Sequence, residues 1–447
     1  MKKFILSIDQ GTTSSRVVLY SLKFKIIDIV QKEFQQYFPK DGWVEHDALE
    51  IWLDVKNLIR KILIKNKIKS LNVVSIGITN QRETTVLWNK KTGKPVNKAI
   101  VWQDRRTADY CKKLKKEKKE SKIQNITGLV IDPYFSATKI KWILENNVLA
   151  KKTLKNENLL FGTIDTWLLW KLTKGKSHIT DVTNASRTML YDINKGNWSK
   201  KLLKFFNIPN SILPKVVGNI HHFGTTEILR NKIKISSMIG DQQSALIGNA
   251  CFNKGMSKST YGTGCFFLMN IGNKIKLSKN RLLTSIAYQL NGKFYYCIEG
   301  SIFIAGAAIQ WLRDGIKIIK HPKETEKLYI KADNKQNIYF VPAFTGMGAP
   351  YWKSDVRGAI YGINRNTGIP EIVMATLRSI CFQTKDLVNS LEEDSKTKIN
   401  EIRIDGGMIN NKEFVQFLCN ILNIKIVVPV YSETTALGVA YLCGIDS

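Results

Sequence analysis

The sequence predicts an α/β fold made of two domains with related topology. In the first half, strand-like runs such as Phe4 to Ile8 and Val73 to Thr79 alternate with helical stretches such as Ala48 to Lys65. This alternation is typical of an α/β domain with a parallel or mixed sheet. The second half restarts with Lys258 to Leu268, which again has a strand, a turn rich in glycine and hydroxyls, and a strand. We therefore expect two domains, residues 1–247 and 248–447, on either side of one cleft.

Composition excludes several other classes of protein. At 447 residues with 44% hydrophobic side chains, the chain can fill the cores of two or three domains. A formal net charge of +31 raises the question of nucleic-acid binding. However, most basic residues are scattered lysines, and the densest run, Lys112 to Lys122, includes acidic residues and is typical of a solvated helix face. We predict no nucleic-acid partner.

The cysteines and the N-terminus indicate the cellular compartment. Seven cysteines without CxxC spacing favour a reducing environment over a disulfide framework. The start resembles a signal peptide, but Asp9 and Gln10 interrupt its apolar run too early. No apolar stretch approaches the roughly 18 residues of a membrane span. We therefore expect a cytoplasmic protein without a membrane span.

The segment Phe4 to Tyr20 predicts two strands joined by a turn that suits phosphate. Gly11 lets backbone amides approach an anion closely, and Arg16 adds a positive fork. Asp9 would repel phosphates unless a divalent cation lay between them. An ordinary hairpin with a polar turn is the alternative. The remaining donors of the turn are Thr12, Thr13 and Ser14.

Polar residues also follow two later strand-like runs. Arg82 and Glu83 either pair locally or offer a donor and an acceptor to a polyhydroxyl substrate. Asp241, followed by Gln242, either caps a helix or serves as a general base at the carboxyl end of a strand. Trp102 is either a core residue or the wall of a small site.

Two helix starts follow in the first half. Tyr134 precedes an amphipathic helix, and spacing places Ile140, Ile143 and Leu144 of that helix in the core. Asp165 or Thr166 is expected to cap the helix that follows the strand-like run at Leu159.

Two glycine-containing segments occur in the second half. Gly306 to Gln310 is expected to begin a helix, and Asp405 to Asn411 is expected to form a strand-to-helix turn. Both suit the close approach of a nucleotide, but tight turns with helix caps would have the same composition.

Taken together, these segments resemble the FGGY carbohydrate kinases, and within that family the members that act on glycerol. Tyr134 to Asn146 matches the first family signature, and Gly358 to Leu377 matches most of the second. Several long motifs in the right order are a strong signal. The other matching motifs are Asp9 to Arg16, Gln81 to Thr84, Gly240 to Gln243, Tyr261 to Phe266 and Glu433 to Gly438.

The resemblance implies a duplicated ribonuclease H-like fold of the actin-type ATPase class, with two domains flanking a central cleft. It implies Mg²⁺-assisted transfer of a phosphoryl group from ATP to glycerol, giving sn-glycerol 3-phosphate in the first step of glycerol utilisation. Asp241 would be the general base, and Asp9 would lie near the magnesium ion. Glycerol would contact Arg82, Glu83, Trp102, Tyr134, Asp241, Gln242 and Phe266. The nucleotide would contact Thr12, Thr13, Ser14, Arg16, Thr263, Gly306, Gln310, Gly407 and Asn411.

Other functions stay open at this point. A kinase for another sugar or polyol, such as xylulose or gluconate, would share the fold. Trp102 and Phe266 favour a small substrate, because aromatic walls narrow the site. A catalytically silent ATP-binding relative is the second alternative, and the intact Asp9 and Asp241 argue against it. A homo-oligomer is compatible with the resemblance. Because the chain stops at Ser447, we expect a second domain that is shortened at its C-terminus.

Overall fold

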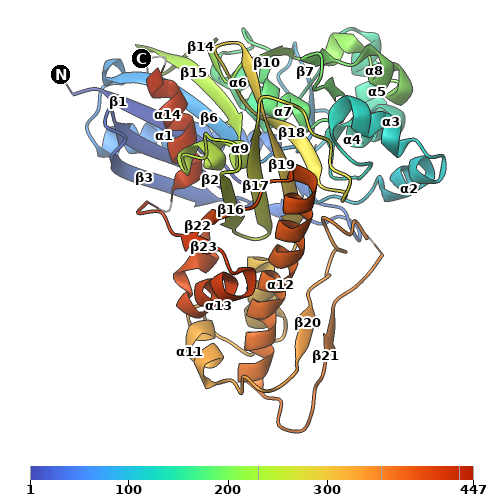
Figure 1. Cartoon of the computed structure of the whole chain (residues 1–447). Coiled ribbons are helices and arrows are strands. Elements are labelled where there is room, and N and C mark those ends of the chain that lie inside the picture. The colour runs from blue at the N-terminus through green and yellow to red at the C-terminus, as the bar shows by residue number, and fades with distance from the viewer. Residues whose placement is uncertain (1, 230, 354, 432, 446–447) are drawn as a thin grey trace. The chain divides into compact units, whose positions relative to one another are not determined.

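The structure is a computed structural model that describes residues 2–229, 231–353, 355–431 and 433–445 (Figure 1). The chain divides into two compact units. Unit 1 consists of Met1–Ala250, Ser285–Tyr296 and Glu433–Ser447, and unit 2 consists of Cys251–Thr284 and Cys297–Ser432.

Unit 1 is built on a six-stranded mixed sheet with the order β14-β15-β6-β1-β2-β3. Strand β1 (Phe4–Gln10) runs antiparallel to β2 (Ser14–Ser21) and parallel to β6 (Val73–Asn80). Strand β6 in turn runs parallel to β15 (Asn231–Gly240). The carboxyl ends of β1, β6 and β15 therefore meet at one edge of the sheet. The outer strands are β3 (Ile26–Glu33) and β14 (Ile220–Leu229).

Helices cover both faces of this sheet. Helix α1 (Ala48–Lys65) is capped by the side chain of Asp47 and packs in one core with Leu6 and Val17. The alternating residues Ile5 and Val18 point to the other face, where they pack with α14 (Thr434–Ile445). Figure 1 shows this last helix, in red, beside the blue strand β1. Period-two alternation along the strands thus produces two apolar layers.

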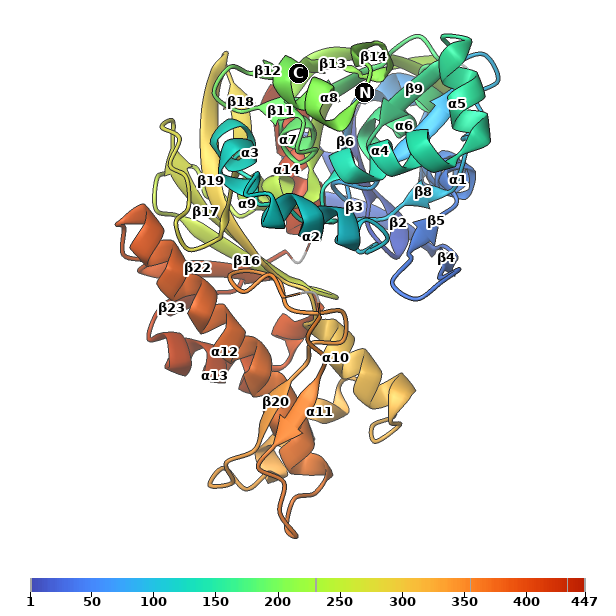
Figure 2. The ribbon, with the colours of Figure 1, turned by 90° about the vertical axis from the view of Figure 1, so that its right-hand side faces the viewer.

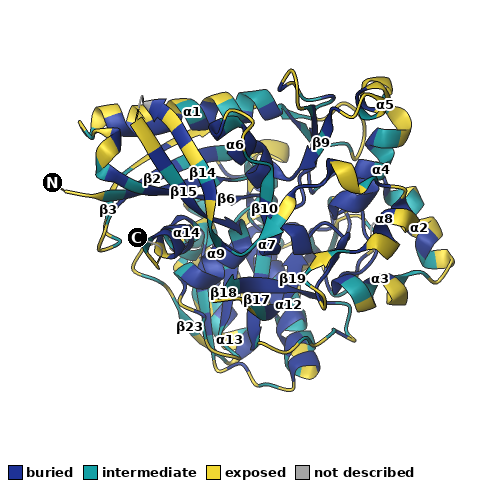
Figure 3. Cartoon of the chain, turned by 90° about the horizontal axis from the view of Figure 1, so that it is seen from above, coloured by how far each residue is buried: buried dark blue, intermediate teal, exposed yellow. Residues whose placement is uncertain are grey.

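The remaining elements of unit 1 lie outside its six-stranded sheet. Figure 3 shows exposed residues in yellow on the outer helices, whereas the central strands β1 and β6 consist mostly of buried residues. These elements are β4 (Gln36–Tyr37), β5 (Glu45–His46), β7 (Val86–Asn89), β8 (Ala99–Ile100), α2 (Ala108–Lys116), α3 (Glu120–Thr127), α4 (Ser136–Asn146), α5 (Val148–Lys155), β9 (Leu159–Gly162), α6 (Ile164–Leu172), β10 (Ile179–Asp181), α7 (Val182–Ser186), β11 (Tyr191–Asp192), β12 (Asn197–Trp198), α8 (Lys200–Phe206), β13 (Lys215–Val217) and α9 (Asp241–Gly248).

Within unit 2, strands β17, β16, β22 and β23 lie side by side in this order and repeat the central pairing of the first sheet. Strand β16 (Ser257–Tyr261) runs antiparallel to β17 (Cys265–Gly272) and parallel to β22 (Glu401–Asp405), as β1 does to β2 and β6. Helix α12 packs against α11 and α13 (Figure 2). The residues of β18 (Leu283–Leu290) and β19 (Lys293–Ile302) are divided between the two units, because Ser285–Tyr296 belong to unit 1. The other elements of unit 2 are α10 (Gly306–Gln310), the π-helical turn Trp311–Gly315, α11 (Glu324–Lys331), β20 (Tyr339–Val341), β21 (Ala359–Tyr361), α12 (Ile369–Ser395), α13 (Lys412–Leu422) and β23 (Lys425–Val427).

Most local expectations are confirmed, and two are wrong. The helix expected at Ala48 to Lys65 has those bounds. Helix α6, however, begins at Ile164 with Thr163 as its N-cap residue, and Asp165 instead accepts hydrogen bonds from the Thr163 and Thr180 hydroxyls. Leu144 is only half-buried, because it lies at the edge of the apolar face of α4. The domain boundary at residues 247 and 248 stays a prediction. In the part of the chain that the structure describes, no helix is long and apolar enough to cross a membrane.

Candidate functional site

The turn that was predicted to bind phosphate lies between β1 and β2. The Gly11 amide donates to the Ser14 carbonyl at 2.9 Å and closes the turn. Arg16 forms an ion pair with Glu433, which precedes α14, and also donates to the Gln31 side chain at 2.9 Å and 3.1 Å. Sequence reasoning quoted the motif containing Glu433 but gave this acid no role. Its contact with Arg16 places a second carboxylate near the loop.

Asp9 is in an unfavourable environment for a charged carboxylate. Burial raises its pKa to about 7, and the nearby Asp241 and Glu433 carboxylates add to the rise, while Arg16 opposes it. A divalent cation would relieve this repulsion. Among the described residues, no three histidines, cysteines or acids form a metal cluster. Because Mg²⁺ often takes one or two carboxylates and completes its shell with phosphates and water, Asp9 fits a magnesium ion shared with a nucleotide.

Arg82, Glu83 and Asp241 lie together where β6 and β15 end. The Nε atom of Arg82 lies 3.4 Å from Asp241 Oδ1 and 3.9 Å from Glu83 Oε1. Its Nη1 atom donates to Gln243 at 3.0 Å. The side chains of Arg82 and Glu83 are 1% exposed, whereas that of Asp241 is 24% exposed. Of these three, Asp241 is therefore the group that an entering molecule reaches most easily.

Asp241 is the first residue of α9, and Gly240 holds the N-cap position. The alternative in which Asp241 is the N-cap is therefore wrong. Its carboxylate accepts from the Gln242 amide at 2.7 Å and from the Gln242 side chain at 3.3 Å. A negative charge in the first turn of a helix is favoured by the helix dipole.

The backbone at Glu83 has an unusual conformation that its neighbours hold in place. Its φ of +61° is rare for a residue with a side chain. The Ser136 hydroxyl donates to the Glu83 carbonyl at 3.0 Å, and Arg187 binds the Glu83 carboxylate. The Arg187 guanidinium also lies 5.2 Å from the ring centroid of Tyr134. Sequence reasoning missed Arg187, because nothing in its local sequence distinguishes it.

Trp102 connects the proposed substrate wall to the phosphate loop. Its ring packs edge-on against Tyr134, with centroids 5.5 Å apart. Its indole N–H donates to the Thr12 hydroxyl at 2.9 Å. Trp102 is nearly buried, as a core residue would be, but this hydrogen bond joins it to a residue expected to bind nucleotide. Thr13 lies in the same turn, and its carbonyl accepts from the Phe34 amide at 3.3 Å. The Ser14 hydroxyl accepts from Gln31 at 3.0 Å.

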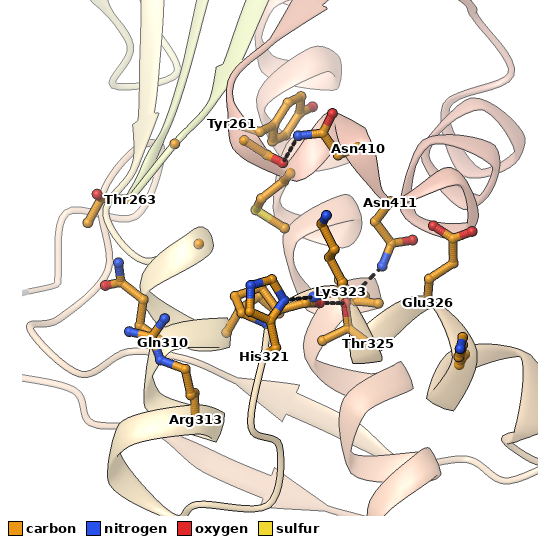
Figure 4. Close-up of a pocket in the computed structure, with 18 of the residues that line it drawn as sticks. Tyr261, Thr263, Gln310, Arg313, His321, Lys323, Thr325, Glu326, Asn410 and Asn411 are labelled. Atoms are coloured by element: carbon orange, nitrogen blue, oxygen red, sulfur yellow. Dashed lines mark hydrogen bonds between the residues drawn. The ribbon is translucent and has the colours of Figure 1, made fainter. Parts of the chain in front are cut away.

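Unit 2 contains a cavity of about 800 Å³ (Figure 4). All five residues of this unit that were predicted to contact the nucleotide line it, namely Thr263, Gly306, Gln310, Gly407 and Asn411. Figure 4 shows Thr263 and Gln310 on one side, and Thr325 and Asn411 on the other. A Cβ atom on Gly306 would lie 2.6 Å from the Gly262 carbonyl oxygen, so only glycine fits there.

Other cavity residues were not anticipated. His321, Lys323 and Thr325 come from the loop before α11 and the start of that helix, where no motif marks them. Asn411 donates to the Thr325 hydroxyl at 3.0 Å, and its own oxygen caps α13 by accepting from Phe414 at 2.9 Å. Phe266, the second expected wall of the substrate site, lies half-buried on β17. Its role stays a prediction.

Comparison with known proteins decides the family. Residues 4–248 match the N-terminal domain, and residues 258–447 the C-terminal domain, of the FGGY family of carbohydrate kinases. The chain belongs to the FGGY family. The predicted fold, with two α/β units of the actin-type ATPase class, is confirmed for this family member.

The FGGY protein is similar over its full length to several glycerol kinases. It is 52% identical to glycerol kinase 1 of Pseudomonas aeruginosa and 53% identical to glycerol kinase of Alteromonas mediterranea, covering 100% of this chain and 91% of each relative. The structure of Plasmodium falciparum glycerol kinase with ADP is 42% identical and superposes with a TM-score of 0.90, covering 100% of this chain and 90% of the other. A xylulose kinase of Lactobacillus acidophilus, at 22% identity and a TM-score of 0.86 over 99% and 89% of the two chains, shares the fold.

Proposed function

We propose that this FGGY protein is a glycerol kinase, which transfers the γ-phosphoryl group of ATP to a terminal hydroxyl of glycerol and forms sn-glycerol 3-phosphate. The observation that carries the proposal is the cluster of Arg82, Glu83 and Asp241 at the ends of β6 and β15. This cluster offers one donor fork and two acceptors within a few ångströms, as a polyol requires. Full-length identity above 50% to proteins named glycerol kinase supports the same substrate.

In the proposed reaction, Asp241 accepts the proton of the attacking hydroxyl. It is the most exposed member of the cluster, and Arg82 orients it from 3.4 Å. Glu83 accepts from a second hydroxyl and Arg82 donates to the substrate, so that one terminal oxygen is presented to the γ-phosphorus. Tyr134 and Gln242 complete the contacts to hydroxyls, while Trp102 and Phe266 form apolar walls. Fixed geometry of this kind supplies much of the barrier reduction.

Two groups of residues are proposed to contact the nucleotide. Thr12, Thr13, Ser14 and Arg16 donate to its phosphates from the β1–β2 turn, and the residues that line the cavity of unit 2 hold the rest of ATP. Since phosphoryl transfer has a loose transition state, these residues need only position the groups and balance their charge. Asp9 would hold Mg²⁺, which when bound supplies positive charge to the phosphates. A cytoplasmic location and a homo-oligomeric state stay predictions.

The substrate assignment is tested with purified protein, ATP, Mg²⁺ and a panel of glycerol, xylulose and gluconate. ADP formation with glycerol alone is expected. Turnover with another member of the panel and not with glycerol would refute the substrate, and no turnover with any of them would support a silent relative.

The role of Asp241 is tested separately with Asp241→Asn. We expect turnover to be abolished while calorimetry still detects glycerol binding, because the amide keeps the shape but cannot take the proton. Asp28→Asn, which changes a half-buried acid on β3 that is paired with Lys65, is the matched control. Near-normal turnover of Asp241→Asn would contradict the assignment.

A further inference from the structure

The short helix α7 and its flanking residues, Asp181 to Arg187, lie beneath the proposed acceptor site. Sequence patterns assigned no function to this segment. Asp181 caps the helix by accepting from the Thr183 amide at 2.6 Å and from the Asn184 side chain at 2.7 Å. Asp181, Thr183, Asn184 and Arg187 are each 0% exposed. The segment is therefore enclosed by protein, and its contacts reach the ends of β15 and β6 and the side chain of Glu83.

The first contact is with the residue directly before Asp241. The Thr183 hydroxyl donates its single proton to the Asp181 carboxylate and accepts the Gly240 amide hydrogen at 2.9 Å. Because the Thr183 hydroxyl donates its only proton to Asp181, a lone pair of the same oxygen is available to accept the Gly240 amide hydrogen. This chain of two hydrogen bonds fixes the backbone that carries the proposed general base.

The second contact is with the end of β6. Asn184 and Asn80 form a reciprocal pair, in which each side-chain amide donates to the other's oxygen at 3.0 Å. Asn80 also donates to the Gln81 carbonyl at 2.8 Å. The pair therefore holds the backbone just before Arg82.

The third contact reaches Glu83 itself. Arg187 binds the Glu83 carboxylate, and its guanidinium packs 5.2 Å from the ring centroids of both Tyr134 and Phe135. The Thr188 carbonyl next to it accepts the Ala137 amide hydrogen at 2.8 Å, which ties this end of the segment to the first turn of α4. One stretch of the chain is thus bonded to the supports of both acidic groups.

We propose that Asp181 to Arg187 is a positioning element that fixes Glu83 and Asp241 in one geometry for the acceptor hydroxyls. The proposal rests on the proposed function. Buried and mutually satisfied hydrogen bonds give a rigid arrangement, and small displacements of reacting groups reduce rates strongly. Arg187 holds the carboxylate of Glu83, which is proposed to bind the substrate, whereas Thr183 holds the backbone of Gly240 next to the proposed base Asp241. The two residues should therefore affect different kinetic constants.

The test uses steady-state kinetics on the full chain with Arg187→Met, Arg187→Lys and Thr183→Val. Arg187→Met should raise the KM for glycerol by about tenfold, which is about 1.4 kcal/mol, and leave the KM for ATP nearly unchanged. Arg187→Lys keeps the charge and should recover part of this loss. Thr183→Val should lower kcat by about tenfold with a smaller change in the KM for glycerol. The matched control is Thr127→Val outside the element, where a buried hydroxyl likewise donates once, to the Ile123 carbonyl at 2.8 Å, and accepts one backbone amide hydrogen, from Leu129 at 3.1 Å.

A parallel rise in the KM values for glycerol and ATP, or an equal loss of activity in Thr127→Val, would show a general structural role and overturn the proposal. If Arg187→Met does not fold, Thr183→Val alone tests the proposal. A folded Thr183→Val variant with the kcat of wild type would overturn the proposal. Wild-type turnover is measured first. If wild type prefers another polyol, the substrate assignment fails and the same ratios, measured with that polyol, still test the positioning element. If wild type neither turns over nor binds any polyol by calorimetry, both proposals fail.

Discussion

Lys139 should make the stability of the protein depend on pH in a way that a surface lysine would not. The residue lies on α4, is 0% exposed, and donates to the Tyr134 carbonyl at 2.6 Å. Burial lowers its pKa from 10.5 to about 7, although Glu83, Asp104 and Asp132 oppose the shift. Between these two pH values the unfolded chain binds a proton that the folded chain does not. The free energy of unfolding should therefore rise with pH across this window.

The magnitude follows from the size of the shift. Each pH unit inside the window contributes about 1.4 kcal/mol. Lys139→Met keeps an unbranched side chain but cannot titrate. The difference in unfolding free energy, wild type minus variant, should therefore increase by about 2 kcal/mol between pH 7.5 and 9. Below pH 7 both states of the wild type are protonated, and the difference should level off.

Urea denaturation at several pH values, followed by circular dichroism, measures this difference. Lys151→Met, at an exposed lysine of α5, controls for the loss of one positive charge. The reasoning would be refuted if the free energy of unfolding of wild type, minus that of Lys139→Met, stayed constant or fell with rising pH.

Three further predictions concern the phosphate loop, the final helix and the cavity of unit 2. Trp102→Phe and Thr12→Val should each raise the KM for ATP by about fivefold, which is the contribution of one hydrogen bond. The double variant should raise this KM no more than either single variant, because both remove the same Trp102–Thr12 hydrogen bond, and additive increases would contradict this coupling. Gly438→Ala should lower the Tm of unfolding markedly, because the new Cβ on α14 would lie 1.9 Å from the Ser244 carbonyl oxygen on α9. An unchanged Tm would show that α14 and α9 can move apart without loss of stability. Asn411→Ala should lower the free energy of unfolding by about 1 kcal/mol, because it removes the cap of α13, and it should also bind ATP more weakly. Asn411→Asp should keep the cap and lose only the hydrogen bond that Asn411 donates to Thr325. Equal stability losses in these two variants, measured by urea denaturation, would speak against the cap.

Local patterns predicted the elements and the residues at their ends. Arg82 and Asp241 are far apart in sequence, yet each follows a buried strand. Because β6 and β15 are parallel neighbours, the ends of these strands must meet. The turn between β1 and β2 was predictable from its glycine and hydroxyls between two apolar runs, whereas its binding of phosphate stays a prediction.

Residues that act through partners distant in sequence escaped prediction. Arg187 and Glu433 bind Glu83 and Arg16, which are 104 and 417 positions away, and neither local segment indicates its partner. Lys139 stands in an amphipathic helix, where a lysine usually faces solvent, but here it is buried and donates to the Tyr134 carbonyl. Only the folded chain shows that the long stem and the amine of this lysine are enclosed.

The placement of α14 has a consequence for protein synthesis. This helix covers Ile5, Val18 and Tyr20 with Ala436, Ala440 and Cys443, so the earliest strands depend on residues translated after the whole of unit 2. At ordinary elongation rates, roughly ten to forty seconds separate the emergence of Ala250 from that of Glu433. Throughout that interval one face of the nascent sheet lacks its cover. The part of the enzyme that is made first is therefore among the last to finish folding.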